Sequence, residues 1–218
     1  MPDSNHEFLN ICVQNEILMF GKFTLKSGRI SPYFFNAGNF DHGNLLAALG
    51  TAFARLIADT LEPPYMLYGP AYKGIPIAAA TAVQLSALHN INVPYAFNRK
   101  EAKDHGEGGV IVGAPLTGNV VILDDVITAG TSVNESVQII RQAGAEPHAI
   151  CIALDRQEIA DGESLSAAAK VSQTYDMPVH SLIRLDDLID FLGDNSGLAD
   201  HLPSVREYRS RFGYNVSD

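Results

Sequence analysis

Two adjacent carboxylates, Asp124 and Asp125, follow four apolar residues and precede a small turn, Thr128–Ser132. Placing two like charges at the end of a buried strand is electrostatically unfavourable, which points to a ligand that they bind. Backbone N–H groups in such a turn, at the start of a helix, form a cradle for phosphate. Gly130 lets the backbone approach a ligand closely. The hydroxyl donors of the turn are Thr128, Thr131 and Ser132.

Carboxylates beside a phosphate cradle need a reason, because they repel the same ligand. They can accept hydrogen bonds from sugar hydroxyls, or engage a divalent cation that also touches phosphate. A ribose 5-phosphate satisfies both halves of the motif, with its diol on the acids and its phosphate on the turn. The alternative is that Asp124 and Asp125 only cap the next helix, but a cap needs one acid and leaves the turn unexplained. The turn also lacks the G-x-x-x-x-G-K-[ST] pattern of an ATPase phosphate loop.

Short apolar segments alternate with helical ones along the middle of the chain. This alternation is typical of a parallel sheet covered by helices on both faces, in which ligands bind at the carboxyl ends of the strands. The sequence therefore predicts an α/β fold in one domain, residues 1–218. The expected strands are 65–68, 94–98, 120–123, 149–154 and 179–183, and the expected central helices are 75–88 and 132–143.

The ends of the chain differ from this pattern. Residues 1–40 read as a helix over 5–19 followed by a hairpin or irregular arm over 21–38, and Asp41 is a candidate cap for a second helix. That helix carries an apolar stripe. Its members are Leu45, Leu46, Leu49, Phe53, Leu56 and Ile57. Two C-terminal helices are expected near 185–192 and 198–211. The polar, Gly-rich segment 98–119 is too long for a routine connection and is expected to be a loop.

Composition excludes several classes of protein. The 218 residues are 46% hydrophobic and 18% charged, with a net charge of −10 and a pI near 5.0. This acidity argues against nucleic acid as the main ligand, so any anion must be held by a local cluster of cations. Cys12 and Cys151 make no disulfide framework and read as buried thiols of a reducing compartment. No signal peptide or membrane-spanning stretch is expected, so we expect a cytoplasmic protein without a membrane partner.

The motif at 120–132 resembles the phosphoribosyl pyrophosphate motif of type I phosphoribosyltransferases. Four further segments resemble the orotate phosphoribosyltransferase family and occur in the expected order; they are 20–38, 68–78, 97–109 and 153–158. The resemblance implies the type I phosphoribosyltransferase fold, with a central mainly parallel sheet flanked by helices, a small N-terminal hood and a flexible lid loop. It also implies Mg²⁺-dependent conversion of orotate and phosphoribosyl pyrophosphate to orotidine 5′-monophosphate and pyrophosphate, in pyrimidine (UMP) biosynthesis, by a homodimer with shared active sites.

The resemblance also assigns residues. The phosphoribosyl pyrophosphate site comprises Lys26, Tyr72, Lys73, Arg99, Lys100, Lys103, His105, Asp124, Asp125, Val126, Ile127, Thr128, Ala129, Gly130, Thr131 and Ser132. The orotate site comprises Lys26, Phe34, Phe35, Thr128 and Arg156, and the residues closest to the chemistry are Arg99, Lys103, His105, Asp124 and Asp125. Mg²⁺ would be held mainly by pyrophosphate and ribose oxygens of the substrate, with water-mediated contacts to Asp124 and Asp125 as a further option.

The chemistry of these side chains agrees with the assigned roles. Loss of pyrophosphate builds oxocarbenium character on ribose and negative charge on the leaving group, which the cations of residues 99–105 would stabilise. A cationic lid would also exclude water from the reactive sugar. Orotate carries a carboxylate, and Arg156 offers a planar, bidentate fork.

Three simpler interpretations stay open at this point. The charge run 99–105 can be a solvated surface, Lys73 an ordinary surface lysine, and Phe34 with Phe35 ordinary core. Two rival functions also remain. A purine or uracil phosphoribosyltransferase would need no carboxylate clamp, which Arg156 argues against. A ligand-sensing regulator on the same fold would need a nucleic-acid surface, which the net charge of −10 disfavours.

Overall fold

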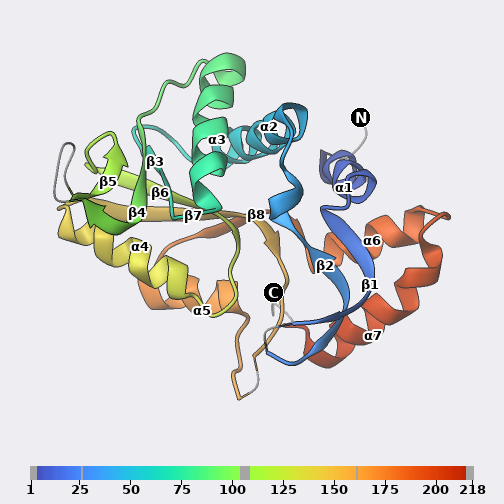
Figure 1. The fold of residues 1–218 in the computed structure, drawn as a ribbon. Coiled ribbons are helices and arrows are strands. Elements are labelled where there is room, and N and C mark those ends of the chain that lie inside the picture. The colour runs from blue at the N-terminus through green and yellow to red at the C-terminus, as the bar shows by residue number, and fades with distance from the viewer. Residues whose placement is uncertain (1–3, 26, 104–108, 161, 215–218) are drawn as a thin grey trace.

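The computed structural model describes residues 4–25, 27–103, 109–160 and 162–214. Within these ranges, six strands form one sheet in the order β5-β4-β3-β6-β7-β8. All neighbours are parallel except β5, which runs antiparallel to β4 (Figure 1). This is the mainly parallel sheet that the strand–helix alternation predicts. The strands are β3 (Met66–Gly69), β4 (Tyr95–Lys103), β5 (Gly109–Gly113), β6 (Asn119–Val126), β7 (Glu146–Asp155) and β8 (Val179–Arg184).

Helices cover both faces of the sheet, α2 and α3 one face and α4 and α5 the other (Figure 1). Because side chains alternate along a strand, β6 sends Val121 and Leu123 into the core under α2 and α3, and Val120 and Ile122 into the core over α4. A strand buried on both faces is uniformly apolar for this reason. These helices are α2 (Gly43–Thr60), α3 (Gly74–His89), α4 (Thr131–Gln142) and α5 (Ala167–Tyr175).

The N- and C-terminal segments pack together beyond the β8 edge of the sheet (Figure 1). Strands β1 (Leu18–Thr24) and β2 (Ile30–Phe35) form an antiparallel hairpin, so the expected arm over 21–38 is confirmed as a hairpin. Tyr33 of β2 meets Tyr208 of α7 edge to face, with 6.1 Å between ring centroids. The remaining elements are α1 (Ser4–Gln14), η1 (Ala37–Asn39), α6 (Leu185–Asp194), η2 (Ala199–His201) and α7 (Leu202–Phe212).

Two expectations for the N-terminal region are wrong. The first helix ends at Gln14 rather than at residue 19, because the chain turns at Glu16, whose φ is +55°. Ile17 still reaches the core, but from the turn into β1. Asp41 does not cap the second helix. The cap position is His42, and the Asp41 carboxylate contacts the Nδ1 atom of that ring at 2.6 Å.

The segment 98–119 is not wholly a loop as expected. Strand β4 continues to Lys103, and β5 returns antiparallel to it from Gly109 to Gly113. The apolar part of β5 is only three residues long, 110–112, and glycines flank it, so the segment reads as a polar, Gly-rich loop although it forms an edge strand. Sequence patterning also missed α5. Among the described helices, none is both long and apolar enough to cross a membrane.

Candidate active site

The residues expected to bind ligand lie at the carboxyl ends of four neighbouring strands. In sheet order these are β4, β3, β6 and β7. Arg99 and Lys100 belong to β4, the turn with Lys73 follows β3, the Asp124–Asp125 pair lies on β6, and Arg156 follows β7. Parallel strands place their carboxyl ends on one edge of a sheet, so the fold brings these four segments together.

The Asp124 and Asp125 carboxylates are buried, at 8% and 7% relative exposure. Ser132 Oγ donates a hydrogen bond to Asp124 Oδ2 at 2.9 Å, and the Asp125 backbone N–H donates to Asp124 Oδ1 at the same distance. Lys73 Nζ lies 2.7 Å from Asp125 Oδ2. The interpretation of the two acids as a helix cap is wrong, because both lie within β6 and the cap of α4 is Gly130.

Ionising Asp124 next to Asp125 is electrostatically unfavourable. Burial, reinforced by the neighbouring Asp125 charge, raises the pKa of Asp124 to about 6. Hydrogen bonds from the Asp125 N–H and from Ser132 act in the opposite direction and hold the pKa of Asp124 down. A buried carboxylate with an elevated pKa in a cluster of charged groups is typical of a functional site, because a ligand donating hydrogen bonds would relieve the cost of ionising it.

The turn after β6 has the geometry of an anion cradle. Gly130 adopts a left-handed conformation with φ of +75° and leads into the first turn of α4. Thr128, Ala129 and Thr131 are exposed, whereas Ile127 is buried and anchors the turn to the core below α4. The first N–H groups of a helix have no partner within the helix, and they meet an anion at the positive end of its dipole.

The turn between β3 and α3 holds Lys73 against the acids. Two glycines at its ends allow the close approach: a Cβ on Gly74 would lie 2.7 Å from the Leu123 carbonyl oxygen and 2.8 Å from the carbonyl carbon of Gly69. The Ala71 N–H donates to Asn98 Oδ1 of β4 at 2.9 Å, and the Ala71–Tyr72 peptide bond is cis. These contacts make Lys73 a partner of the buried Asp125 rather than an ordinary surface lysine.

The described part of the charge run reaches the same turn. Lys100 Nζ lies 4.9 Å from the ring centroid of Tyr72, which is exposed. Arg99 is half-buried, and its Nη1 atom lies 3.5 Å from the Gly109 carbonyl oxygen across the β4–β5 pair. Lys26 and His105 lie outside the described residues, as does the side chain of Lys103.

Arg156 occupies a largely buried position between the end of β7 and the hairpin, with 12% of its side chain exposed. Its guanidinium carbon lies 4.5 Å from the ring centroid of Tyr33, and Nη2 lies 2.6 Å from Glu158 Oε1 and 3.3 Å from Ser31 Oγ. Burial alone would lower the pKa of this guanidinium. The neighbouring Tyr33 and Glu158 outweigh that effect and raise the pKa above its ordinary value, so the side chain stays charged. The fold therefore presents a fixed cation next to β2.

The adjacent residues Phe34 and Phe35 face opposite sides of β2. The Phe35 ring is buried and packs against Phe40, with 6.4 Å between ring centroids. Phe34 is exposed and stacks on Phe23 at 5.5 Å. Period-two alternation explains the split. The ordinary-core interpretation therefore applies to the Phe35 ring, and only Phe34 can offer a flat apolar wall to a ligand.

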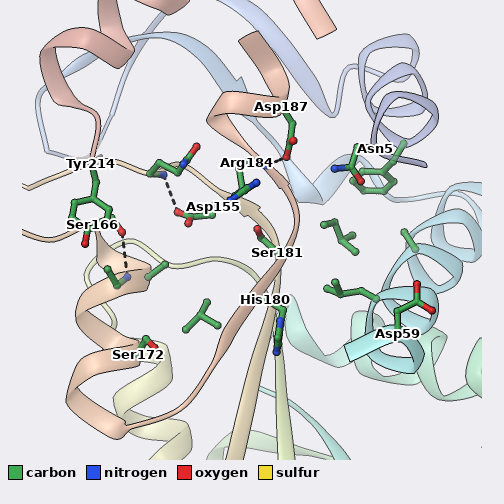
Figure 2. Close-up of a pocket in the computed structure, with 18 of the residues that line it drawn as sticks. Asn5, Asp59, Asp155, Ser166, Ser172, His180, Ser181, Arg184, Asp187 and Tyr214 are labelled. Atoms are coloured by element: carbon green, nitrogen blue, oxygen red, sulfur yellow. Dashed lines mark hydrogen bonds between the residues drawn. The ribbon is translucent and has the colours of Figure 1, made fainter. Parts of the chain in front are cut away.

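A cavity of about 600 Å³ lies elsewhere, beside the outer edge of β8 (Figure 2). None of the residues assigned to ligand binding lines it. Of the residues that line the cavity, Asp155 and Gln157 are the two chain neighbours of Arg156. The Gln157 backbone N–H donates a hydrogen bond to Asp155 Oδ1 at 2.8 Å. The residues expected to carry the chemistry therefore lie at the carboxyl edge and outside this cavity.

Sequence patterns missed several residues that shape the site. Glu158, Tyr33 and Ser31 surround Arg156, and Asn98 holds the turn before Lys73. Glu158 lies two positions after Arg156 within the segment 153–158, so it was visible there as an unassigned charge. The other three depend on contacts between distant parts of the chain, which no local pattern carries.

The donors present suit a metal that is bound chiefly by substrate. Among the described residues, no group of three or more His, Cys, Asp or Glu side chains is arranged to hold a metal ion. Asp124 and Asp125 supply hard oxygen donors, but Asp125 already pairs with Lys73 and Asp124 accepts from Ser132. Mg²⁺ retains water ligands and binds through a few carboxylates plus substrate phosphates, which fits this arrangement.

A family model described as a phosphoribosyl transferase domain matches residues 39–175. Together with the fold and the acid pair beside the anion cradle, this match defines the chain as a phosphoribosyltransferase. Orotate phosphoribosyltransferase from Proteus mirabilis is 55% identical over 215 residues, which is 99% of this chain and 100% of that protein. The chain therefore belongs to the orotate phosphoribosyltransferase family.

Two further relatives agree. Orotate phosphoribosyltransferase from Thioalkalivibrio sulfidiphilus is 56% identical over 213 residues, covering 98% of this chain and 100% of that protein. The crystal structure of the orotate phosphoribosyltransferase from Francisella tularensis superposes with a TM-score of 0.85 at 40% identity, covering 95% of this chain and 99% of that one. The expected type I phosphoribosyltransferase fold is thus confirmed.

Proposed function

We propose that the protein transfers ribose 5-phosphate from phosphoribosyl pyrophosphate to orotate, giving orotidine 5′-monophosphate and pyrophosphate, as a step of pyrimidine (UMP) biosynthesis. The observation that carries this proposal is the buried guanidinium of Arg156 at the end of β7, the strand next to the Asp124–Asp125 pair on β6. A charged fork beside a sugar-phosphate site suits a base that carries a carboxylate.

The donor would bind across β6 and its turn. The Asp124 and Asp125 carboxylates would accept hydrogen bonds from the ribose hydroxyls, and the turn 126–132 would surround the 5′-phosphate with backbone N–H groups and hydroxyls. The buried position of the acids supports this role, because hydrogen bonds made in a low-dielectric site are stronger than in water. Ser132, which donates to Asp124, would link the two halves of the donor site.

The cations of the site would stabilise the leaving pyrophosphate. As the bond from C1′ to the pyrophosphate oxygen breaks, positive charge spreads over the ribose ring and negative charge grows on the leaving group. Lys73, Arg99 and Lys100 belong to the described site, and the resemblance adds Lys26, Lys103 and His105. The nitrogen of orotate forms the new bond on the opposite face from the departing group. A lid over the pyrophosphate would keep water from competing with orotate for C1′.

Mg²⁺ is the cofactor of this proposal. The Asp124 and Asp125 carboxylates would hold it through water, while substrate oxygens supply the other ligands. When bound, the metal neutralises charge on the pyrophosphate. The residues of the chain then have separate tasks: the acids orient the ribose, and Lys73 balances the charge of Asp125 at 2.7 Å.

The orotate pocket would lie between Arg156 and β2. Arg156 would bind the carboxylate of the base, Phe34 would give an apolar wall, and the backbone of Phe34 and Phe35 would offer polar groups. Thr128 and Lys26 complete the set that the resemblance assigns. A purine or uracil acceptor would leave the buried Arg156 charge without its substrate partner, which disfavours the neighbouring phosphoribosyltransferase activities.

We also propose a homodimer with shared active sites. Several large apolar side chains are exposed around α3, at the start of β4 and on β5; they are Tyr72, Val83, Leu88, Tyr95 and Val110. Exposed apolar residues of this number around one element favour a protein interface. Because Tyr72 belongs both to this surface and to the site, and Lys100 lies over its ring, the partner subunit would lie next to the leaving group. A cytoplasmic location suits the two buried free thiols, Cys12 and Cys151.

Steady-state orotate consumption by the wild type and by Arg156→Leu tests the proposal. We expect the KM for orotate to rise about 30-fold or more in the variant, because a bidentate, charge-assisted contact is lost. The KM for phosphoribosyl pyrophosphate should change little. Arg156→Lys should fall between the two, since it keeps the charge without the fork. Arg141→Leu is the control, because Arg141 lies on α4 against Tyr175. An unchanged orotate KM in Arg156→Leu would remove Arg156 from the base site.

A further inference from the structure

Glu158 closes a three-membered arrangement around Arg156. Both side chains are largely buried, at 12% exposure for Arg156 and 14% for Glu158, and Nη2 of the guanidinium lies 2.6 Å from Glu158 Oε1. Tyr33 OH donates to that same Oε1 atom at 3.1 Å, while the Tyr33 ring lies under the guanidinium at 4.5 Å. Each member therefore contacts the other two.

This arrangement fixes the plane of the guanidinium. An arginine side chain has several rotatable bonds, and a bidentate bond to a carboxylate forms only when the fork lies in the plane of its partner. The Tyr33 ring restricts motion perpendicular to the plane, and the Glu158 carboxylate restricts rotation within it. Pre-organisation of this kind favours binding, because less side-chain freedom is lost when the ligand arrives.

Donors of Arg156 remain for a ligand. The contacts to Glu158 and Ser31 both engage Nη2, and the Tyr208 hydroxyl is a further polar neighbour of the guanidinium. A guanidinium has five N–H donors in all, so the pair with Glu158 leaves part of the fork for a second carboxylate. Glu158 also balances the charge of Arg156 before the ligand binds. This matters because a buried cation without an anionic partner is costly.

The chain at Glu158 and Ile159 is held independently of Arg156. Glu158 forms a bridge with Gly213, Ile159 N donates to the Phe212 carbonyl oxygen at 2.9 Å, and Arg29 Nη1 donates to the Ile159 carbonyl oxygen at 2.7 Å. The hairpin and the end of α7 thus clamp the segment that follows Arg156. Glu158 has a fixed backbone from which to position its neighbour, and the loss of its carboxylate would leave that backbone in place.

We propose that Glu158 is a positioning residue for base recognition: with Tyr33, it holds Arg156 in the orientation that binds the carboxylate of the acceptor base. The inference rests on the proposed role of Arg156 in binding orotate. The competing explanation is that Glu158 only stabilises the fold, and it predicts a different pattern of kinetic changes.

The test compares Glu158→Ala and Glu158→Gln with the wild-type protein. Loss of the carboxylate in Glu158→Ala should raise the KM for orotate about 10-fold or more and leave the KM for phosphoribosyl pyrophosphate within about 2-fold. Glu158→Gln keeps an acceptor oxygen for Nη2 and should recover to within about 3-fold of the wild type. Glu163→Ala is the matched control, because Glu163 makes a 2.6 Å pair with Lys170 on the surface.

A second measurement isolates the contribution of the carboxylate on the base. Orotidine 5′-monophosphate and uridine 5′-monophosphate differ only in that group, so their ratio of inhibition constants reports how well Arg156 binds it. Glu158→Ala should reduce the preference for orotidine 5′-monophosphate about 10-fold, with uridine 5′-monophosphate inhibition unchanged. A lower melting temperature with equal losses for both nucleotides and both substrates would overturn the proposal in favour of a stabilising role.

Two further outcomes separate this inference from the proposed function. If Arg156→Leu raises the orotate KM but Glu158→Ala does not, Glu158 has no positioning role and the base assignment stands. If neither variant changes it, both are wrong. Should Glu158→Ala fail to fold, Tyr33→Phe decides the question, because it removes the 3.1 Å bond to Glu158 and keeps the ring. An orotate KM raised about 3-fold or more in that variant supports the proposal, and an unchanged value overturns it.

Discussion

The Asp124 carboxyl is costly to ionise in the free protein. Its carboxyl group is buried beside Asp125, and its pKa is raised to about 6 from an ordinary value of 3.8. Because the folded state favours the protonated form, the stability of the fold decreases as the pH rises from about 4 to about 6. Above that range the ionised carboxylate costs the fold about 3 kcal/mol. Hydrogen bonds from ribose hydroxyls would offset this cost in the complex.

Replacing Asp124 with Asn should therefore stabilise the free protein and impair catalysis. At pH 7.5 we expect the free energy of unfolding to rise by about 1 to 3 kcal/mol, because the buried charge is gone while the amide oxygen can still accept from Ser132. The gain should shrink to a small fraction near pH 4 and disappear below the ordinary pKa of 3.8, where the carboxyl is protonated in both states. Catalytic efficiency should fall about 100-fold or more.

Urea unfolding at pH 4 and pH 7.5, with steady-state rates at pH 7.5, measures these effects. A variant that is no more stable than the wild type at pH 7.5 would show that Asp124 carries no buried-charge cost. A stabilised variant with wild-type turnover would separate that cost from function.

Individual residues of the site could be predicted from the sequence only where they fall within one continuous motif. Asp124, Asp125 and the turn 126–132 are contiguous, so their chemistry is legible without a structure. Glu158 and Tyr33 are not, because their contact joins residues 125 positions apart. Phe34 is exposed and Phe35 is buried because side chains alternate along a strand, but this can be predicted only once β2 is known to have one buried face.

At the scale of elements, the turn between β3 and α3 depends on backbone proximity. Gly74 begins α3 directly against the end of β6, and the turn carries Lys73 to the acids. A Cβ at Gly74 would lie 2.5 Å from Pro70 Cδ and 2.7 Å from the Leu123 carbonyl oxygen, which are distances that no neighbouring backbone can accept without moving.

Gly74→Ala should consequently displace the turn. We expect a loss of about 2 to 4 kcal/mol in the free energy of unfolding and a rise in the KM for phosphoribosyl pyrophosphate. Gly43→Ala is the matched control: Gly43 also begins a helix, and a Cβ there meets nothing within 4 Å, so its stability should be unchanged or slightly higher. Thermal unfolding and donor titrations compare the two. Equal behaviour of both variants would show that the turn tolerates displacement.

Elements were predictable in proportion to their burial. The central strands β3, β6 and β7 each contain a run of buried, mostly apolar residues, so sequence patterns place them well. Strand β5 has only three apolar residues, 110–112, and it is partly exposed. Lys100 and Glu101 of β4 are polar and exposed, so sequence patterning predicts a loop for this region. Helix α5 follows a polar connection and has only two fully buried residues, Ala168 and Val171, which leaves a weak periodic signal.

At the scale of the whole molecule, the apolar surface around α3 adjoins the cations of the site. Tyr72 is exposed on that surface and lies under Lys100, 4.9 Å from its ammonium group. A partner subunit covering this surface would bring its own lid toward the same leaving group. If the proposed dimer forms through this surface, its sites would be shared between subunits, which kinetics can detect.

Hybrid dimers of two inactive variants test whether the subunits share their active sites. Lys103→Ala disables the proposed lid, and Arg156→Leu disables the base pocket, so each homodimer should be nearly inactive. A mixed dimer would contain one intact site, made from the pocket of one chain and the lid of the other. Random re-association should then restore about one quarter of the wild-type rate, because half of the dimers are hybrids and each has one working site. Absence of rescue in purified hybrids would mean that each subunit is self-contained.

The choice of acceptor base tests the account most directly. Purified protein is given phosphoribosyl pyrophosphate and Mg²⁺ with orotate, uracil, hypoxanthine or adenine, and the loss of the base is followed by its absorbance. We predict rapid loss of orotate, dependent on both the donor and the metal, with the other three bases consumed at least about 100-fold more slowly. Consumption of any of those three at a rate equal to or above that of orotate would contradict the assignment of Arg156 as the carboxylate-binding group of an orotate site.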